Sequence, residues 1–232
     1  MAAVLSRGWC RALNEDLYGT TVGGGASGFG TVFRITQSGS LATLYSFCSQ
    51  SGCPDGGAPE AGLVRAIDGN FYGTTAGAGT NIGGTIFKIT PNGTLTTLYS
   101  FCPQDVCADG ASPYASLIEA TNGDFYGTTP FAFPNHTCAQ FCGTIFSLSV
   151  GLGPFVETQT TSGKMGAAVT ILGPDLTDAT SVTFNGTAAA FTVNSTGTAI
   201  STTVPTGATT GTVQVVTPSG TLSSNVTFRV LP

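Results

Sequence analysis

Charged side chains are scarce in this sequence. Only 8% of its 232 residues are Asp, Glu, Lys or Arg, against about 25% in an average globular protein. The seven Lys and Arg are scattered singly, and twelve Asp and Glu bring the net charge to −5. No basic stripe could neutralise the phosphates of a nucleic acid or bind an anionic membrane surface. We therefore expect neither as a partner.

Long apolar runs are also missing. No segment approaches the roughly 20 apolar residues that a membrane-spanning helix needs, so we expect no membrane insertion. Residues 1–14 lack a long apolar stretch and a clear cleavage site, and they do not form a convincing signal peptide. Either the chain is not exported, or its export signal lies outside this sequence.

Glycine, by contrast, is abundant at 33 residues, and Ser and Thr are common. Amphipathic helices normally carry Lys and Glu on their solvent face, and this sequence has few of either. The composition instead favours many short strands joined by tight turns. We predict an all-β fold.

One phrase occurs three times at an interval of 54 residues. It reads LYGTT at 17–21 and FYGTT at 71–75 and 125–129. The surrounding segments align as well: 8–21 with 62–75 and 116–129, and 30–48 with 84–102. The third copy keeps GTIFSLS at 143–149, five residues late, and departs before any LYSF segment. Such a period predicts a repeat architecture.

Each copy is predicted to hold four short strands, exemplified by LVRA, FYGTT, TIFKIT and TLTTLYSF in the second copy. Turn-forming residues separate these segments. Four antiparallel strands in about 40–50 residues form a blade of a β-propeller. A β-solenoid is the main alternative, although its coils are usually shorter. We predict about three propeller-like repeats in residues 1–150.

Alternation along the third strand of each copy predicts the contacts between blades, because residues two apart share a face. The predicted inter-blade core consists of Phe33 and Ile35, Phe87 and Ile89, and Phe146 and Leu148. Gly73 is expected to let a neighbouring ring or backbone approach closely. Propellers usually have four to eight blades. Three copies therefore imply either a piece of a longer array or self-association, for example of two chains.

Six of the seven cysteines stand in close pairs. We predict three local disulfides: Cys48–Cys53, Cys102–Cys107 and Cys138–Cys142. A zinc site is the alternative, but the spacings are unusual for zinc and the pairs belong to different repeats. Paired cysteines imply an oxidising compartment, so the periplasm, the cell surface or the cell exterior. Cys10 aligns with apolar strand positions and is expected to be a small core residue.

Few residues suggest catalysis or metal binding. His136 is the only histidine and lies in the insertion at 130–142; a Ser-His-Asp site is conceivable, but no G-x-S-x-G elbow occurs. Calcium prefers oxygen ligands, so the recurrent Asp16, Asp68 and Asp124 are calcium candidates. The simpler interpretation of these residues is tight turns, and the same holds for Asp55 and Asp109.

The sequence changes character after residue 150. Residues 151–232 contain no copy of the repeated phrase and about seven short alternating strands, which predicts an immunoglobulin-like β-sandwich. Pairs that share a face are expected to form the core between its sheets. They are Val169 and Ile171, Val182 and Phe184, Val213 and Val215, and Phe228 and Val230.

Two resemblances to known families extend these predictions. Residues 154–232, with SGKMGAAVTILGPDL, VPTGATTGTVQVVTPSG and a final VTFRV, resemble an IPT/TIG domain. Residues 7–149, with DGNFYGTT and GGTIFKITPNGTLTTLYSF, resemble the GloVer tandem repeats of secreted, surface-anchored bacterial proteins. The resemblances imply an extracytoplasmic bacterial protein, and they carry no catalytic residues to transfer.

Two functions remain open at this stage. The first is a non-enzymatic binding or structural protein whose repeat loops meet a glycan or protein ligand, with no required cofactor. The second is an extracytoplasmic hydrolase or lactonase, perhaps calcium-assisted in the manner of some propellers, which rests on analogy of fold alone.

Overall fold

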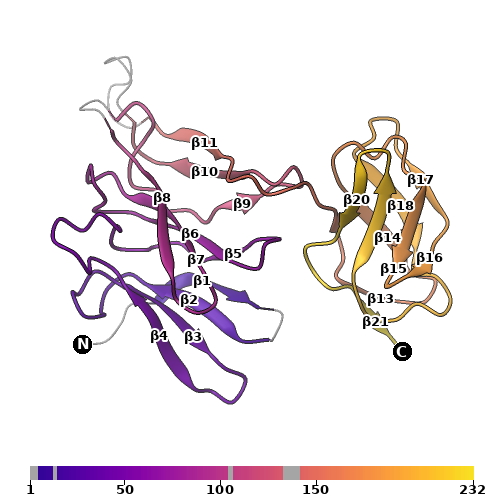
Figure 1. Cartoon of the computed structure of the whole chain (residues 1–232), viewed down its shortest axis with the longest axis horizontal. Coiled ribbons are helices and arrows are strands. Elements are labelled where there is room, and N and C mark those ends of the chain that lie inside the picture. Colours follow the sequence, from indigo (N-terminus) through magenta and orange to yellow (C-terminus); the bar gives the residue numbers. More distant parts are fainter. Residues whose placement is uncertain (1–4, 13–14, 104–106, 133–141) are drawn as a thin grey trace. The chain divides into compact units, whose positions relative to one another are not determined.

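The computed structural model describes residues 5–12, 15–103, 107–132 and 142–232. All regular secondary structure in these ranges is β-strand, as predicted (Figure 1). The chain divides into two compact units, one of Met1–Glu119 with Phe125–Leu148 and one of Ala120–Asp124 with Ser149–Pro232. No helix in the described ranges is long and apolar enough to cross a membrane.

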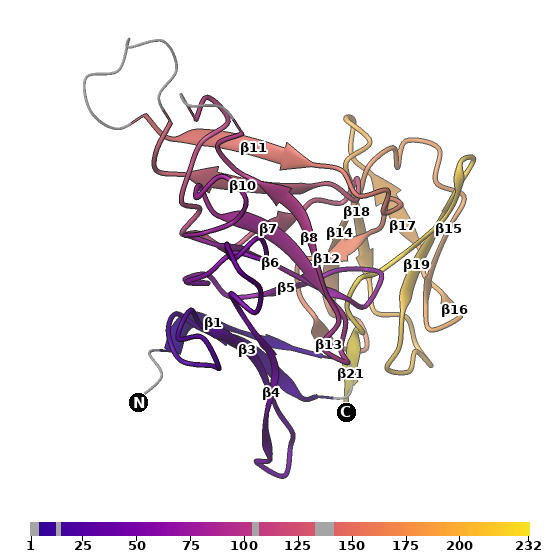
Figure 2. The same ribbon diagram turned by 60° about the vertical axis from the view of Figure 1, so that its left-hand side comes forward.

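The first unit holds one antiparallel sheet for each copy of the repeat (Figure 2). The first sheet consists of β1 (Leu5–Arg11), β2 (Leu17–Thr21), β3 (Thr31–Ile35) and β4 (Leu41–Ser46), in that order. The second consists of β5 (Val64–Arg65), β6 (Phe71–Thr75), β7 (Thr85–Ile89) and β8 (Leu95–Ser100), again in order. The third has only β9 (Ile118–Glu119), β10 (Phe125–Thr129) and β11 (Thr144–Leu148), in the order β11-β10-β9.

Aromatic side chains join neighbouring sheets. Tyr18 stacks on Phe71 with ring centroids 4.1 Å apart. One period later, Tyr72 stacks on Phe125 at 4.3 Å. The tyrosine of each of the first two phrases thus packs on the first residue of the next phrase, which explains why the phrase recurs.

The glycine and threonines of the phrase also serve the scaffold. Gly73 lies opposite Phe87 on the neighbouring strand, and a β-carbon at Gly73 would come within 2.7 Å of the ring. The predicted close approach is therefore confirmed. The Thr75 and Thr85 hydroxyls are 2.8 Å apart and hydrogen-bonded, and both other copies repeat this pair. Such buried hydroxyl pairs satisfy each other where water is excluded.

The predicted inter-blade core is largely buried in the first two copies and only half-buried in the third, where Phe146 still packs edge-on against Phe101 of the second copy at 5.0 Å. Phe33, Phe87 and Ile89 are buried, and Ile35 is half-buried. Phe146 and Leu148 are only half-buried, because none of the described residues after β11 adds a fourth strand to its sheet. Among the described residues, no further repeat sheet closes the three into a propeller.

The second unit contains ten strands rather than about seven, because several are only two or three residues long. They are β12 (Glu157–Thr158), β13 (Ser162–Lys164), β14 (Ala168–Leu172), β15 (Ser181–Phe184), β16 (Thr187–Ala188), β17 (Phe191–Val193), β18 (Ala199–Thr203), β19 (Val213–Thr217), β20 (Gly220–Ser223) and β21 (Arg229–Leu231). Two four-stranded sheets have the orders β12-β14-β18-β17 and β16-β15-β19-β20, and β13 pairs in parallel with β21. Seven of the eight predicted core residues are buried in one cluster, and Val230 packs against it partly buried.

Candidate functional site

The predicted calcium ligands lie in separate turns. The Asp68 carboxylate accepts hydrogen bonds from the Asn70 backbone amide and the Tyr72 hydroxyl, both at 3.0 Å. Asp16 lies 3.9 Å from the Arg34 guanidinium, and Asp124 accepts a hydrogen bond from the Asn122 side chain. No group of three or more His, Cys, Asp or Glu that could hold a metal occurs within the described ranges.

The cysteine prediction is tested in part. Cys48 is bonded to Cys53, and Cys102 to Cys107. Cys142 is also disulfide-bonded, whereas its predicted partner Cys138 lies outside the described residues, as does His136. Cys10 is a free, half-buried thiol on β1, and its burial raises its pKa.

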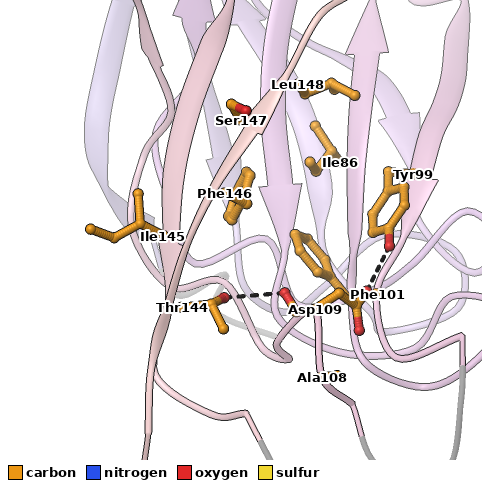
Figure 3. A pocket seen from close by; sticks show the side chains of 10 residues that line it. All are labelled: Ile86, Tyr99, Phe101, Ala108, Asp109, Thr144, Ile145, Phe146, Ser147 and Leu148. Atoms are coloured by element: carbon orange, nitrogen blue, oxygen red, sulfur yellow. Dashed lines mark hydrogen bonds between the residues drawn. The ribbon is translucent and has the colours of Figure 1, made fainter. Parts of the chain in front are cut away.

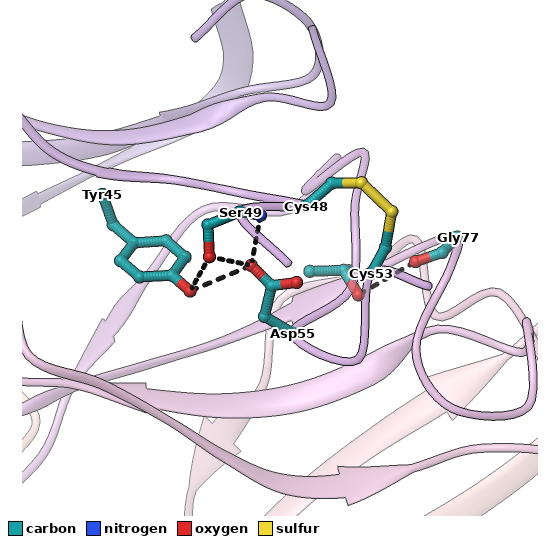
Figure 4. Close-up of a disulfide and its surroundings, with 7 residues drawn as sticks. Tyr45, Cys48, Ser49, Cys53, Asp55 and Gly77 are labelled. Carbon is teal, nitrogen blue, oxygen red and sulfur yellow. Dashed lines mark hydrogen bonds between the residues drawn. A yellow bond between two sulfur atoms is a disulfide. The ribbon is translucent and has the colours of Figure 1, made fainter. Parts of the chain in front are cut away.

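A tyrosine–aspartate pair braces each of the two disulfide loops, and Figure 4 shows the first of them. The Tyr45 hydroxyl donates to the Asp55 carboxylate at 2.9 Å, and the Ser49 amide donates to the same oxygen at 3.3 Å. One period later, Tyr99 donates to Asp109 at 2.7 Å. Sequence reasoning assigned both aspartates to turns and missed this pairing. The available signal was that Tyr and Asp recur together at the same 54-residue interval.

A cleft in the first unit opens between the second and third sheets (Figure 3). It measures about 360 Å³. Its lining comes from β7, β8, the loop after β8 and the whole of β11: Ile86, Tyr99, Phe101, Ala108, Asp109, Thr144, Ile145, Phe146, Ser147 and Leu148. The walls are therefore mostly apolar and aromatic, with hydroxyls and one carboxylate toward the loops.

The cleft exists because the third repeat departs from the pattern. Between the first two sheets, Leu95 of β8 packs into the cluster that contains Phe87 and Ile89. In the part of the chain that the structure describes, the third sheet has no strand in the place of β8. Phe146 and Leu148, the counterparts of Phe87 and Ile89, are consequently left lining the opening.

Asp109 is the one acidic side chain among the lining residues and is held in place from several sides. Its carboxylate accepts a hydrogen bond from the Tyr99 hydroxyl at 2.7 Å and another from the Cys102 backbone amide at 3.1 Å. Its backbone carbonyl accepts a hydrogen bond from the Thr144 hydroxyl at 3.1 Å. Burial, and then the hydrogen bond and charge of Asp109, raise the pKa of Tyr99 to about 12. The Tyr99 hydroxyl is therefore a neutral hydrogen-bonding group at ordinary pH.

The cleft also exposes a strand edge. β11 pairs with β10, and no other described strand pairs with it. Unpaired amide and carbonyl groups along such an edge can bind an extended ligand. The site can therefore combine aromatic surface, hydroxyls, one carboxylate and backbone polar groups. Among its lining residues there is no His, Cys, Lys or Arg that could act as nucleophile or base.

Among the solved structures that resemble the chain are two at 14% identity. A fungal alcohol oxidase of the AA5 family, in complex with copper, has a TM-score of 0.43, with 100% of this chain and 54% of that chain covered. SGBP-B from a xyloglucan utilization locus of Bacteroides uniformis has a TM-score of 0.29, with 99% and 50% covered. The chain spans about half the length of each. Both TM-scores lie below 0.5, so we infer nothing about this chain from either protein.

No curated protein matches the chain. The family model of the Gloeobacter/Verrucomicrobia repeat matches residues 5–200, a range that includes all three copies of the repeated phrase. This match confirms the resemblance that the repeats alone indicated. Since it covers more than half of the sequence, the chain belongs to the Gloeobacter/Verrucomicrobia repeat family.

Proposed function

We propose that this chain is a non-catalytic, extracytoplasmic binding protein that holds a glycan or protein ligand in the cleft beside β11. The single observation that carries the proposal is the cleft itself, about 360 Å³ in volume and lined by Tyr99, Phe101 and Phe146. Ligand sites are typically concave and apolar, with a few placed polar groups, and Asp109 and Thr144 supply such groups here.

The extracytoplasmic location is supported by the disulfides. Cys48–Cys53 and Cys102–Cys107 brace loops of the first unit, and disulfides persist mainly in oxidising compartments. We assign the second unit to the immunoglobulin-like IPT/TIG class, because two four-stranded sheets share one apolar core. Its proposed role is that of a spacer or docking module, and the repeat unit carries the ligand.

A glycan array, run beside a panel of extracellular bacterial proteins, tests the proposal on the full chain. Ser147 is exposed and lines the cleft, so Ser147→Trp should block ligand entry without disturbing the core. Thr96→Trp is the matched control, because Thr96 is an exposed strand residue outside the cleft lining. We expect a ligand whose binding is lost with Ser147→Trp, kept with Thr96→Trp and unaffected by EDTA.

The outcomes separate the competing functions. Binding that Ser147→Trp leaves intact would place the ligand elsewhere and overturn the role of the cleft. Hydrolysis of ester or lactone substrates that EDTA abolishes would instead favour the calcium-assisted hydrolase and refute a purely binding role.

A further inference from the structure

One face of the third sheet exposes residues whose counterparts in the other two sheets are buried or, for Ile118, half-buried. We call this the outer face; it comprises Ile118, Tyr126, Thr128 and Ile145. Tyr126 is 38% exposed and Ile145 is 82% exposed. Their counterparts in the second sheet, Tyr72 and Ile86, are each 1% exposed. The same residue types are thus buried in the second sheet and exposed in the third.

In the first two sheets, the residues at these positions are covered by the sheet of the next repeat. Tyr72 stacks on Phe125, and the Thr74 hydroxyl lies 3.4 Å from the Pro113 carbonyl in the loop that leads to the third sheet. In the first copy, Thr20 donates to the Ala61 carbonyl at 2.8 Å. The outer face therefore carries the side chains that elsewhere receive another repeat sheet.

The chain carries a matching surface at its other end. Leu17 and Phe33 of the first sheet occupy the positions of Phe71 and Phe87, which pack against a preceding sheet in the second copy. Trp9 packs edge-on against Phe33 at 5.3 Å and is 48% exposed, whereas its counterpart Leu63 is buried. The first sheet thus presents the exposed Trp9 and the half-buried Leu17, with Phe33 buried beneath Trp9, as the surface that complements the outer face.

We propose that the outer face binds the first sheet of a second copy of this chain. The contact is head-to-tail, since two different surfaces meet, and it repeats the geometry of the two internal sheet contacts. Head-to-tail contacts form closed rings when their rotation closes and open chains when it does not. Two copies that close would give a six-sheet ring, within the usual range for propellers. Exposed apolar patches of this kind mark association sites.

Sedimentation and light scattering of the full chain over a wide concentration range provide the first test. We expect concentration-dependent self-association that Ile145→Lys weakens about tenfold or more, because the contact would bury an unpaired charge. Val216→Lys is the matched control, since Val216 is an exposed strand residue of the second unit. Ile145 is largely exposed, so its replacement should leave the fold intact, which circular dichroism checks.

A cross-linking experiment tests which surfaces meet. In a Cys10→Ser background, chains with Tyr126→Cys are mixed with chains carrying Leu17→Cys, under mild oxidation. We expect disulfide-linked pairs in the mixture and few in either variant alone. A chain that stays monomeric throughout, association that Ile145→Lys does not weaken, or a mixture without cross-links would each overturn the proposal. Ile145 also borders the ligand cleft, so both experiments use ligand-free protein and their readouts do not depend on ligand binding.

Discussion

Tyr72 stacks on Phe125 with ring centroids 4.3 Å apart and planes inclined by 30°. This contact joins the second and third sheets, and both rings are fully buried. Tyr126 occupies the same place in the next FYGTT phrase but is exposed. Identical local sequence thus has two different environments, which provides an internal control for the energy of sheet-on-sheet packing.

Tyr72→Ala should lower the free energy of unfolding of the first unit by about 3–5 kcal/mol, as for other buried aromatic side chains. Tyr126→Ala should change it by no more than about 0.5 kcal/mol, as for an exposed position. Trp9 is the only tryptophan and lies on β1, so its fluorescence in a urea titration follows this unit separately from the other. Measurements at low protein concentration keep self-association out of the comparison. Equal losses for the two variants would contradict this account of the phrase.

Gly73→Ala tests the close approach of a ring to the backbone. The added carbon would lie 2.7 Å from the Phe87 ring and 2.9 Å from the Leu63 side chain, so the core must shift. Overpacking of this kind typically costs about 1–3 kcal/mol. Gly23→Ala is the control in the same unit, because a β-carbon there meets only the Gly28 carbonyl oxygen, at an ordinary 3.8 Å. The same urea titration gives both values. A Gly73→Ala midpoint equal to that of the unsubstituted chain would contradict this prediction.

The repeat and its strands could be predicted because their signals are local. The phrase FYGTT at 71–75 coincides with β6, since alternation and flanking turns decide where such a strand begins and ends. The packing faces of Phe87 and Ile89 followed from the same alternation. These features need no knowledge of what lies beyond the hairpin.

The cleft could not be predicted in the same way, because it depends on a strand that is absent. The sequence revealed that the third copy lacks its LYSF segment, but the half-exposed Phe146 and Leu148 follow only from the three-dimensional stacking of sheets. The hydrogen bond of Tyr45 to Asp55 was likewise missed, since it joins a strand to a loop across a disulfide. In the second unit, the extra strands are short. β16, for example, has only two residues and cannot show a periodic pattern.

A thiol count tests the cysteine assignment. The chain has seven cysteines, of which Cys10 is free and Cys142 is disulfide-bonded. If the partner of Cys142 is Cys138 as predicted, denatured but unreduced protein should react with one equivalent of a thiol reagent per chain. Fully reduced protein should react with seven equivalents. Peptide mapping under non-reducing conditions should identify the single labelled residue as Cys10. Seven reactive thiols before reduction would overturn the disulfides and, with them, the support for an extracytoplasmic location.

The hydrogen bond from Tyr99 to Asp109 predicts a loss of stability in alkali. Burial and the neighbouring carboxylate raise the pKa of Tyr99 from its ordinary 10.0 to about 12. Below pH 10 the tyrosine is protonated in both the folded and the unfolded chain. Between about pH 10 and 12 the unfolded chain loses this proton first, so the free energy of unfolding falls as the pH rises.

Tyr99→Phe removes that ionisation and should make the decline between pH 10 and 12 shallower. The decline should not vanish, because burial also raises the pKa values of Tyr45 and Tyr72. Urea midpoints followed by Trp9 fluorescence at a series of alkaline pH values measure the slope. Tyr114→Phe is the control, because Tyr114 is exposed and does not line the cleft. If the Tyr99→Phe and Tyr114→Phe variants decline equally steeply, Asp109 does not hold the Tyr99 proton in the folded chain.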